Sequence, residues 1–193
     1  MPPRRRSPSL IASLTDAEAA SVLNQLLIRR PDLLEEAESI ARDMLAEVDA
    51  EALAEDLVAQ LTMVSLDDLN ARAGRHSWGY VDPVEAAWEL LDERVAPFRE
   101  EMLRLQELGF EDQALATLEG ILMGLQAVGG CRKGRYVLES APDFEDDTAM
   151  GVVQAWVRSG RRCKHRTALV EGLLDECAPD LAPFVRSSLV RMG

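Results

Sequence analysis

Three cysteines and one histidine in the last third of the chain could form a metal site. Cysteine thiolates and imidazole are the usual ligands of structural zinc, and such a site needs four of them. If residues 161–177 form one helix, Cys163 and His165 point to different faces, whereas Cys163 and Cys177 share an apolar stripe. We therefore interpret these thiols as buried structural groups, and their odd number and wide spacing predict no disulfide framework. The full set is Cys131, Cys163, His165 and Cys177.

An acidic cluster lies shortly before these residues. Carboxylate oxygens are the ligands that divalent cations prefer, so a metal-dependent helical hydrolase is one possible function. The cluster also lies at the start of a predicted helix over 145–158, where acidic side chains stabilise the free N–H groups. We favour the structural role and keep the hydrolase as an alternative. The cluster consists of Asp143, Glu145, Asp146 and Asp147.

An aromatic loop is predicted over residues 74–81. It contains His76, Trp78 and Tyr80, and a histidine beside aromatic side chains could line a pocket. The chain has no Gly-x-Ser-x-Gly sequence to hold a nucleophile for such a histidine. We therefore assign this loop to a partner-binding surface, with no catalytic residue.

The formal net charge of −13 is distributed unevenly. Residues 11–130 contain 8 arginines and 25 acidic residues, while residues 131–193 contain 10 basic and 9 acidic residues. An acidic body beside local cations predicts a focused patch for a phosphate group or an acidic peptide, and the overall charge disfavours extended nucleic acid. Solvated helix ends are the competing interpretation. The predicted partner-binding cations are Arg132, Lys133, Arg135, Arg158, Arg161, Arg162, Lys164 and Arg166.

The glycine-rich stretch 129–135 also combines glycines with cations, which can hold a phosphate. It lacks the Gly-Lys-Ser/Thr of a phosphate-binding loop and any preceding strand. We interpret it as a helix end followed by a turn.

Helical periodicity extends over nearly the whole chain, and no period-2 run of β-branched residues indicates a strand. Thr15 with Glu18 forms a capping box, and Asp82-Pro83 is a second helix start. We predict an all-α fold of about eight helices in antiparallel hairpins, as a helical repeat or an irregular bundle. Residues 1–9 are predicted to form a flexible basic tail. Residues 10–193 are predicted to form one domain, acidic over 10–130 and charge-balanced over 131–193.

A heptad-like seam marks the longest predicted helix, and Pro97 lies inside it. Proline removes one backbone hydrogen bond, so we expect a kink or a split near Arg94. The next helix contains Gly120 and Gly124, whose spacing of four predicts close contact with another helix. The seam consists of Val84, Trp88, Leu91, Val95, Phe98, Met102 and Leu105.

The segment 105–115, Leu-Gln-Glu-Leu-Gly-Phe-Glu-Asp-Gln-Ala-Leu, resembles the inter-helix turn of tetratricopeptide or HEAT-like hairpins. Residues 29–33 and 79–91 together resemble uncharacterised bacterial all-helical proteins and the helical portions that accompany SWIM zinc fingers. The zinc finger itself is not matched, because only Cys163-Lys164-His165 is present and no Cys-x-Cys precedes it. The resemblance implies a bacterial cytosolic helical-repeat protein without a known activity.

The length of 193 residues suits one domain, or a tight pair of small ones, and a chain of this length needs no metal or disulfide to fold. No apolar run reaches the ~20 residues of a membrane-spanning helix, and no signal sequence is apparent, so we expect a cytoplasmic protein without cofactors.

The leading hypothesis is a non-enzymatic module that binds another protein. The alternatives are a nucleic-acid or phosphate binder that uses the basic clusters at 132–135 and 158–166, and the metal-dependent hydrolase.

Overall fold

The structure is a computed structural model that describes residues 10–77, 79–159 and 164–190, except for the side chains of residues 164 and 165. Trp78, Arg161, Arg162 and Cys163, all named as candidates above, lie outside the described residues. Contacts divide the chain into two compact units, Met1–Leu45 and Ala46–Gly193, where the sequence predicted one domain over 10–193. The charge pattern does not mark this division.

The first unit consists of helices without a core. Thr15 caps α1 as predicted, because its side chain accepts from the Glu18 N–H while Glu18 accepts from the Thr15 N–H. Of the described residues in these helices, none is buried. The elements are the 3-10 helix η1 (Leu10–Ser13), α1 (Asp16–Arg29), the 3-10 helix η2 (Pro31–Leu33) and α2 (Leu34–Leu45).

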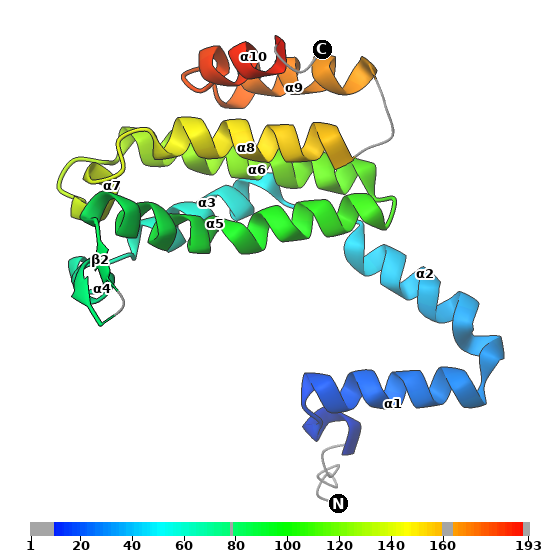
Figure 1. Ribbon diagram of the computed structural model, residues 1–193. Helices are drawn as coiled ribbons and strands as arrows, with labels where there is room; N and C mark the ends of the chain where they lie inside the picture. The colour runs from blue at the N-terminus through cyan, green and yellow to red at the C-terminus, as the bar shows by residue number, and fades with distance from the viewer. Residues whose placement is uncertain (1–9, 78, 160–163, 191–193) are drawn as a thin grey trace, which may run out of the picture. The chain divides into compact units, whose positions relative to one another are not determined.

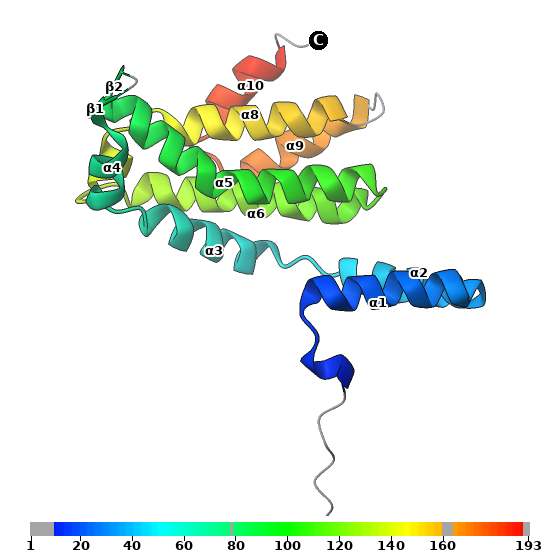
Figure 2. The same cartoon turned by 60° about the horizontal axis from the view of Figure 1, so that its bottom comes forward.

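The second unit is a helical body with all of the buried apolar side chains among the described residues. Its helices α5, α6 and α8 run side by side, and α3 packs along α6 (Figures 1 and 2). The all-α prediction is therefore confirmed. The elements are α3 (Ala50–Thr62), α4 (Leu66–Arg72), β1 (Gly74–His76), β2 (Gly79–Val81), α5 (Pro83–Glu107), α6 (Glu111–Gly130), α7 (Tyr136–Glu139), α8 (Phe144–Ser159), α9 (Lys164–Cys177) and α10 (Ala182–Val190).

The prediction of no strand is wrong at the aromatic loop. β1 and β2 form an antiparallel hairpin in which Arg75 pairs with Tyr80. Gly74 and Gly79 adopt positive φ angles of 101° and 153°, which glycine tolerates without strain. Strands of three residues are too short to show a period-2 pattern in the sequence.

Of the kink or split expected near Arg94, the split does not occur, because α5 continues from Pro83 to Glu107 through Pro97. Pro97 is exposed, and so is Glu93, whose carbonyl loses its helical partner and can bind water instead. Leu91, Val95 and Met102 of the predicted seam are fully buried, whereas Val84 at its start is 48% exposed.

The two glycines of α6 lie against α3, as their spacing predicts. A Cβ atom on Gly120 would lie 2.7 Å from the carbonyl oxygen of Ala50. A Cβ atom on Gly124 would lie 2.9 Å from Cδ2 of Leu57. Only glycine permits this approach of the two helices, which brings α3 onto the central helix of the unit.

Candidate functional site

Arg132, the first predicted binding cation, points into the body. Its guanidinium pairs with the buried carboxylate of Glu145 and donates to the carbonyl oxygens of Leu138 and Ala141, the latter at 2.8 Å. Burial raises the pKa of Glu145 above its ordinary value, although Arg132 opposes this shift. Arg132 therefore ties the end of α6 to the start of α8.

Arg166, at the other end of the predicted basic set, is buried. Its Nη1 donates to the Trp156 carbonyl oxygen at 2.9 Å, and its Nη2 lies 2.5 Å from the Glu111 carboxylate. The guanidinium carbon lies 4.7 Å from the centre of the Trp156 ring, within the range of a cation–π contact. Arg166 thus connects α9 to α8 and α6.

Other predicted cations remain at the surface of the described chain. Lys133, Arg135 and Arg158 are exposed, and Arg135 donates to the carbonyl oxygens of Cys131 and Thr62 at 3.1 and 3.3 Å. Lys164 begins α9, but its side chain lies outside the described residues.

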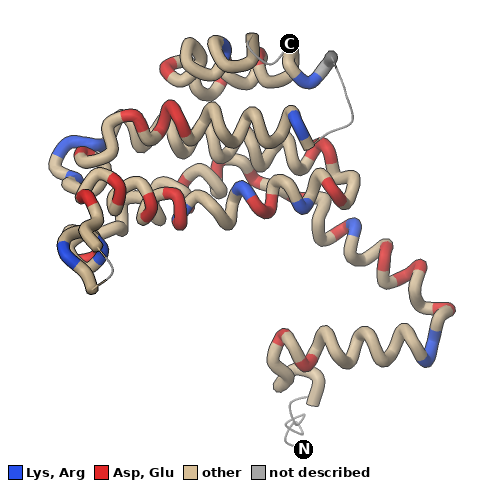
Figure 3. The backbone as a smooth tube through the Cα atoms, in the orientation of Figure 1, with Lys and Arg blue, Asp and Glu red and all other residues tan. Residues whose placement is uncertain are grey.

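The described members of the two basic clusters are not brought together. Residues 132–135 lie near the start of α8, and Arg158 lies near its end (Figure 3). We expected both clusters at one end of the domain if a hairpin separated them. A single long helix separates them instead, and this places them at opposite ends.

The structure places two of the three aromatic-loop candidates in the β hairpin. Tyr80 is 68% exposed, and His76 Nε2 lies 2.7 Å from the Arg72 carbonyl oxygen with which it hydrogen-bonds. Trp78 lies outside the described residues. Trp88, in the following helix, is half-buried and packs edge-on against Phe144 with 5.2 Å between ring centres.

The acidic and thiol candidates do not assemble a metal site in the described part of the chain, where no group of three or more His, Cys, Asp or Glu side chains could hold a metal ion. The interpretation of the thiols as buried is wrong for Cys131, which is exposed, while burial raises the pKa of Cys177 to about 11. The convergence of Cys163 and His165 with these thiols remains untested, because Cys163 and the His165 side chain are not described.

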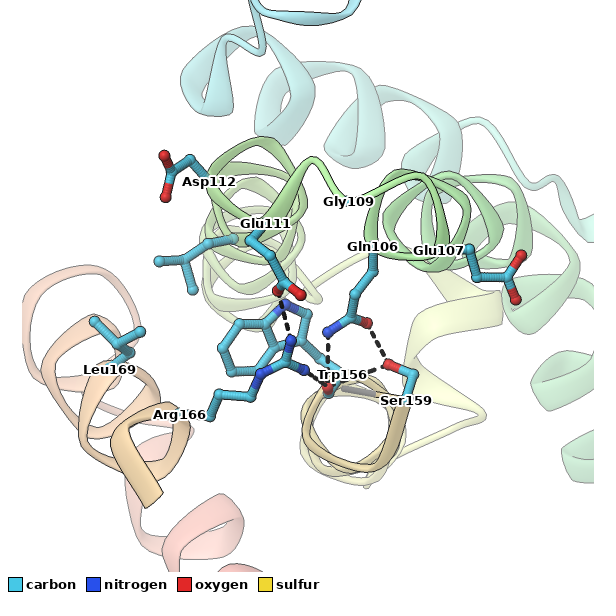
Figure 4. A pocket seen from close by; sticks show the side chains of 10 residues that line it. Gln106, Glu107, Gly109, Glu111, Asp112, Trp156, Ser159, Arg166 and Leu169 are labelled. Atoms are coloured by element: carbon cyan, nitrogen blue, oxygen red, sulfur yellow. Dashed lines mark hydrogen bonds and ion pairs between the residues drawn. The ribbon is translucent and has the colours of Figure 1, made fainter. Parts of the chain in front are cut away.

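A cavity of about 660 Å³ lies among the α5–α6 turn, α8 and α9 (Figure 4). Several polar side chains that line the cavity bond to the same atom, the carbonyl oxygen of Trp156. This oxygen accepts hydrogen bonds from Gln106 Nε2 at 3.1 Å, Ser159 Oγ at 3.2 Å and Arg166 Nη1 at 2.9 Å. These side chains thus hold the three elements together. The lining also includes the carboxylates of Glu107 and Asp112, and the buried Nε1 of Trp156 has no hydrogen-bond partner among the described residues.

A second hollow, of about 470 Å³, lies on the outer side of the α3–α6 contact and differs in character. Val58, Met123 and Ala127 provide apolar lining, and none of the three is buried. Glu51 and Glu55 line the α3 side and are exposed. We name this hollow the α3–α6 groove; Ala54 completes its lining. The sequence pattern does not single out this groove, although Glu51 and Glu55 lie one helical turn apart and close to Val58.

No described helix is both long and apolar enough to cross a membrane. Comparison of the chain with protein families, curated proteins and solved structures finds no match.

Proposed function

We propose that this chain is a non-enzymatic helical module that binds a basic amphipathic helix of another protein in the α3–α6 groove. The observation that carries the proposal is the combination of an apolar lining with two exposed carboxylates on one side. Helix-in-groove recognition uses this combination, because the lining buries the apolar face of the incoming helix and the rim selects its charge.

Charge favours a basic partner over the acidic peptide and the nucleic acid considered above. Residues 46–193 contain 15 basic and 27 acidic residues, a net charge of −12, so long-range attraction favours cations. Arg132 and Arg166 are already engaged with Glu145 and Glu111 inside the body. The phosphate-binding alternative therefore loses two of its described cations, and we place the interaction in the cytoplasm as part of the same proposal.

A labelled peptide tests the proposal directly. The probe is an 18-residue amphipathic helix of leucine and lysine, and fluorescence anisotropy measures its binding. We expect the chain to bind it and to ignore a leucine–glutamate peptide of the same pattern. Val58→Lys combined with Met123→Lys should weaken binding at least about tenfold, because cations would line the apolar surface.

Matched charge changes separate the groove from general attraction. We compare two double variants that alter the net charge equally. Glu51→Lys with Glu55→Lys changes the groove itself, whereas Glu85→Lys with Glu100→Lys changes exposed residues on α5. The first double variant should weaken binding more than the second. Circular dichroism should show the same helix content in all variants. Equal weakening by the two pairs, or binding that survives substitution of the lining, would contradict the proposed groove.

A further inference from the structure

Helix α1 presents an apolar stripe to solvent. Val22, Leu23 and Leu26 are 44%, 48% and 44% exposed. With Ala19 they occupy positions i, i+3, i+4 and i+7, which lie on one side of an α-helix. A hollow of about 370 Å³ lies along this side, with Arg29 among its lining residues. The stripe has the pattern of a helix that packs against another helix.

A helix of this length is only marginally stable by itself. Isolated helices shorter than about 12–15 residues have marginal stability in water. α1, with 14 residues, and α2, with 12, fall in this range. Most helical stability in proteins comes from packing of the apolar side. Neither α1 nor α2 contains a buried residue among those described, so the stripe needs a covering surface.

The charges of α1 indicate what that surface is. Asp16 and Glu18 lie in its first turn, and Arg29 lies in its last turn. Arg30 follows directly but pairs with Asp32 at 2.6 Å, so Arg29 is the cation that this end offers to a partner. Residues 19–28 between these ends contain no charged side chain. Figure 3 shows the acidic end and the basic end of α1 with an uncharged stretch between them. Two copies of a helix that is acidic at one end and basic at the other attract each other at both ends only when they run antiparallel.

We propose that α1 pairs antiparallel with α1 of a second copy of this chain. A two-fold axis near Val22 and Leu23, at the middle of the helix, brings the two apolar stripes together. The same axis places the acidic end of each helix beside the basic end of the other. A parallel pair would place like charges together at both ends, which costs free energy instead of supplying it.

The distribution of charge between the units supports the same partner. Residues 1–45 contain 6 basic and 7 acidic residues, a net charge of −1, whereas residues 46–193 have a net charge of −12. Two copies of the second unit repel each other, and this disfavours association through its surface. The first unit can meet its copy without that repulsion.

A mixing experiment tests the antiparallel pair in the full-length chain. Sedimentation equilibrium measures self-association, for which we expect a dissociation constant on the order of 10 µM, because the interface is small. Asp16→Lys and Arg29→Glu should each weaken the dimer about tenfold, because each replaces the attraction between residues 16 and 29 with repulsion at both ends of the pair. An equimolar mixture of the two variants should recover the affinity, since in the mixed dimer each substituted end faces an end of opposite sign.

The stripe itself has a matched control. Leu26→Gln should abolish the dimer, whereas Ile28→Gln should leave it unchanged, because Ile28 is 70% exposed and lies outside the stripe. A chain that stays monomeric at about 200 µM, or a mixture that fails to recover the affinity, would overturn the proposal. A monomer that Leu26→Gln destabilises would also overturn it, by showing that the chain covers its own stripe. Peptide binding in the α3–α6 groove is independent of these outcomes.

Discussion

The two units of the chain contain the same local signals for helix formation but differ in how far their side chains are buried. A capping box begins α1 in the first unit, and another, formed by Ser65 and Asp68, begins α4 in the second. The first unit nevertheless has no buried residue among those described, while the second encloses side chains such as Leu118 and Phe144 completely. Capping and periodicity therefore determine where helices form. The core is determined by which apolar faces find a partner.

The largest expected difference in unfolding free energy is between a variant that shortens a core side chain of the second unit and one that shortens an exposed side chain of the first. Leu118→Ala should lower the free energy of unfolding by about 3–4 kcal/mol, because a fully buried leucine leaves a cavity. Leu23→Ala should change the unfolding of the second unit by less than about 0.5 kcal/mol. All three tryptophans lie in residues 46–193, so urea unfolding followed by fluorescence reports that unit alone.

Circular dichroism in the same titration reports the helices of both units. The helical signal should therefore begin to fall at a lower urea concentration than the fluorescence signal, because the first unit lacks a core. One coincident transition by both probes would contradict the comparison and would show that the units unfold together.

A smaller effect is expected where α6 meets α3. Gly120→Ala should destabilise the second unit by about 2 kcal/mol, because the new methyl group meets the Ala50 carbonyl oxygen and the helices must separate. Gly151→Ala in α8 adds the same group in open space and should stabilise by about 0.5–1 kcal/mol. Thermal unfolding shows whether each variant is more or less stable than the parent. If Gly120→Ala stabilises the protein, α3 and α6 do not approach each other closely at this residue.

The smallest effect concerns pH and has opposite signs in the two units. The raised pKa of Glu145 means that the folded chain keeps this proton to a higher pH than the unfolded chain does. The resulting stabilisation is present below the ordinary pKa and is lost as the pH rises through the raised value. Glu145→Gln cannot titrate, so its stability should fall less than that of the parent between about pH 4 and pH 7.

The first unit supplies the contrast. Hydrogen bonds from Thr15 lower the pKa of Glu18, so its small contribution is lost as the pH falls instead. Urea unfolding at several pH values, followed by fluorescence, measures the Glu145 effect. An identical pH profile for parent and variant would exclude Glu145 as its source.

The sequence predicted most of the fold because helix signals are local. The capping box at Thr15, the helix start at Asp82-Pro83 and the contact made by Gly120 and Gly124 all follow from short spacings. The three-residue strands gave no such signal. The division after Leu45 has no local signal either, since the apolar spacing of α2 resembles that of helices with a core.

The candidate site was harder to predict, because charge pattern does not show which surface a cation faces. Arg132 pairs with an acid 13 residues away, and Arg166 pairs with one 55 residues away. Nothing in the local sequence connects these partners. The α3–α6 groove likewise depends on two helices that are distant in the chain, so it became visible only in three dimensions.

The pairing of α3 with α6 has a consequence for synthesis on the ribosome. At about 5–20 residues per second, the roughly 70 residues between the end of α3 at Thr62 and the end of α6 at Gly130 take about 3–14 s to translate. During that interval Leu57 and Leu61 of the nascent chain lack the helix that later covers them. The emerging protein therefore exposes an apolar helix for seconds, a window in which chaperones or premature aggregation compete with folding.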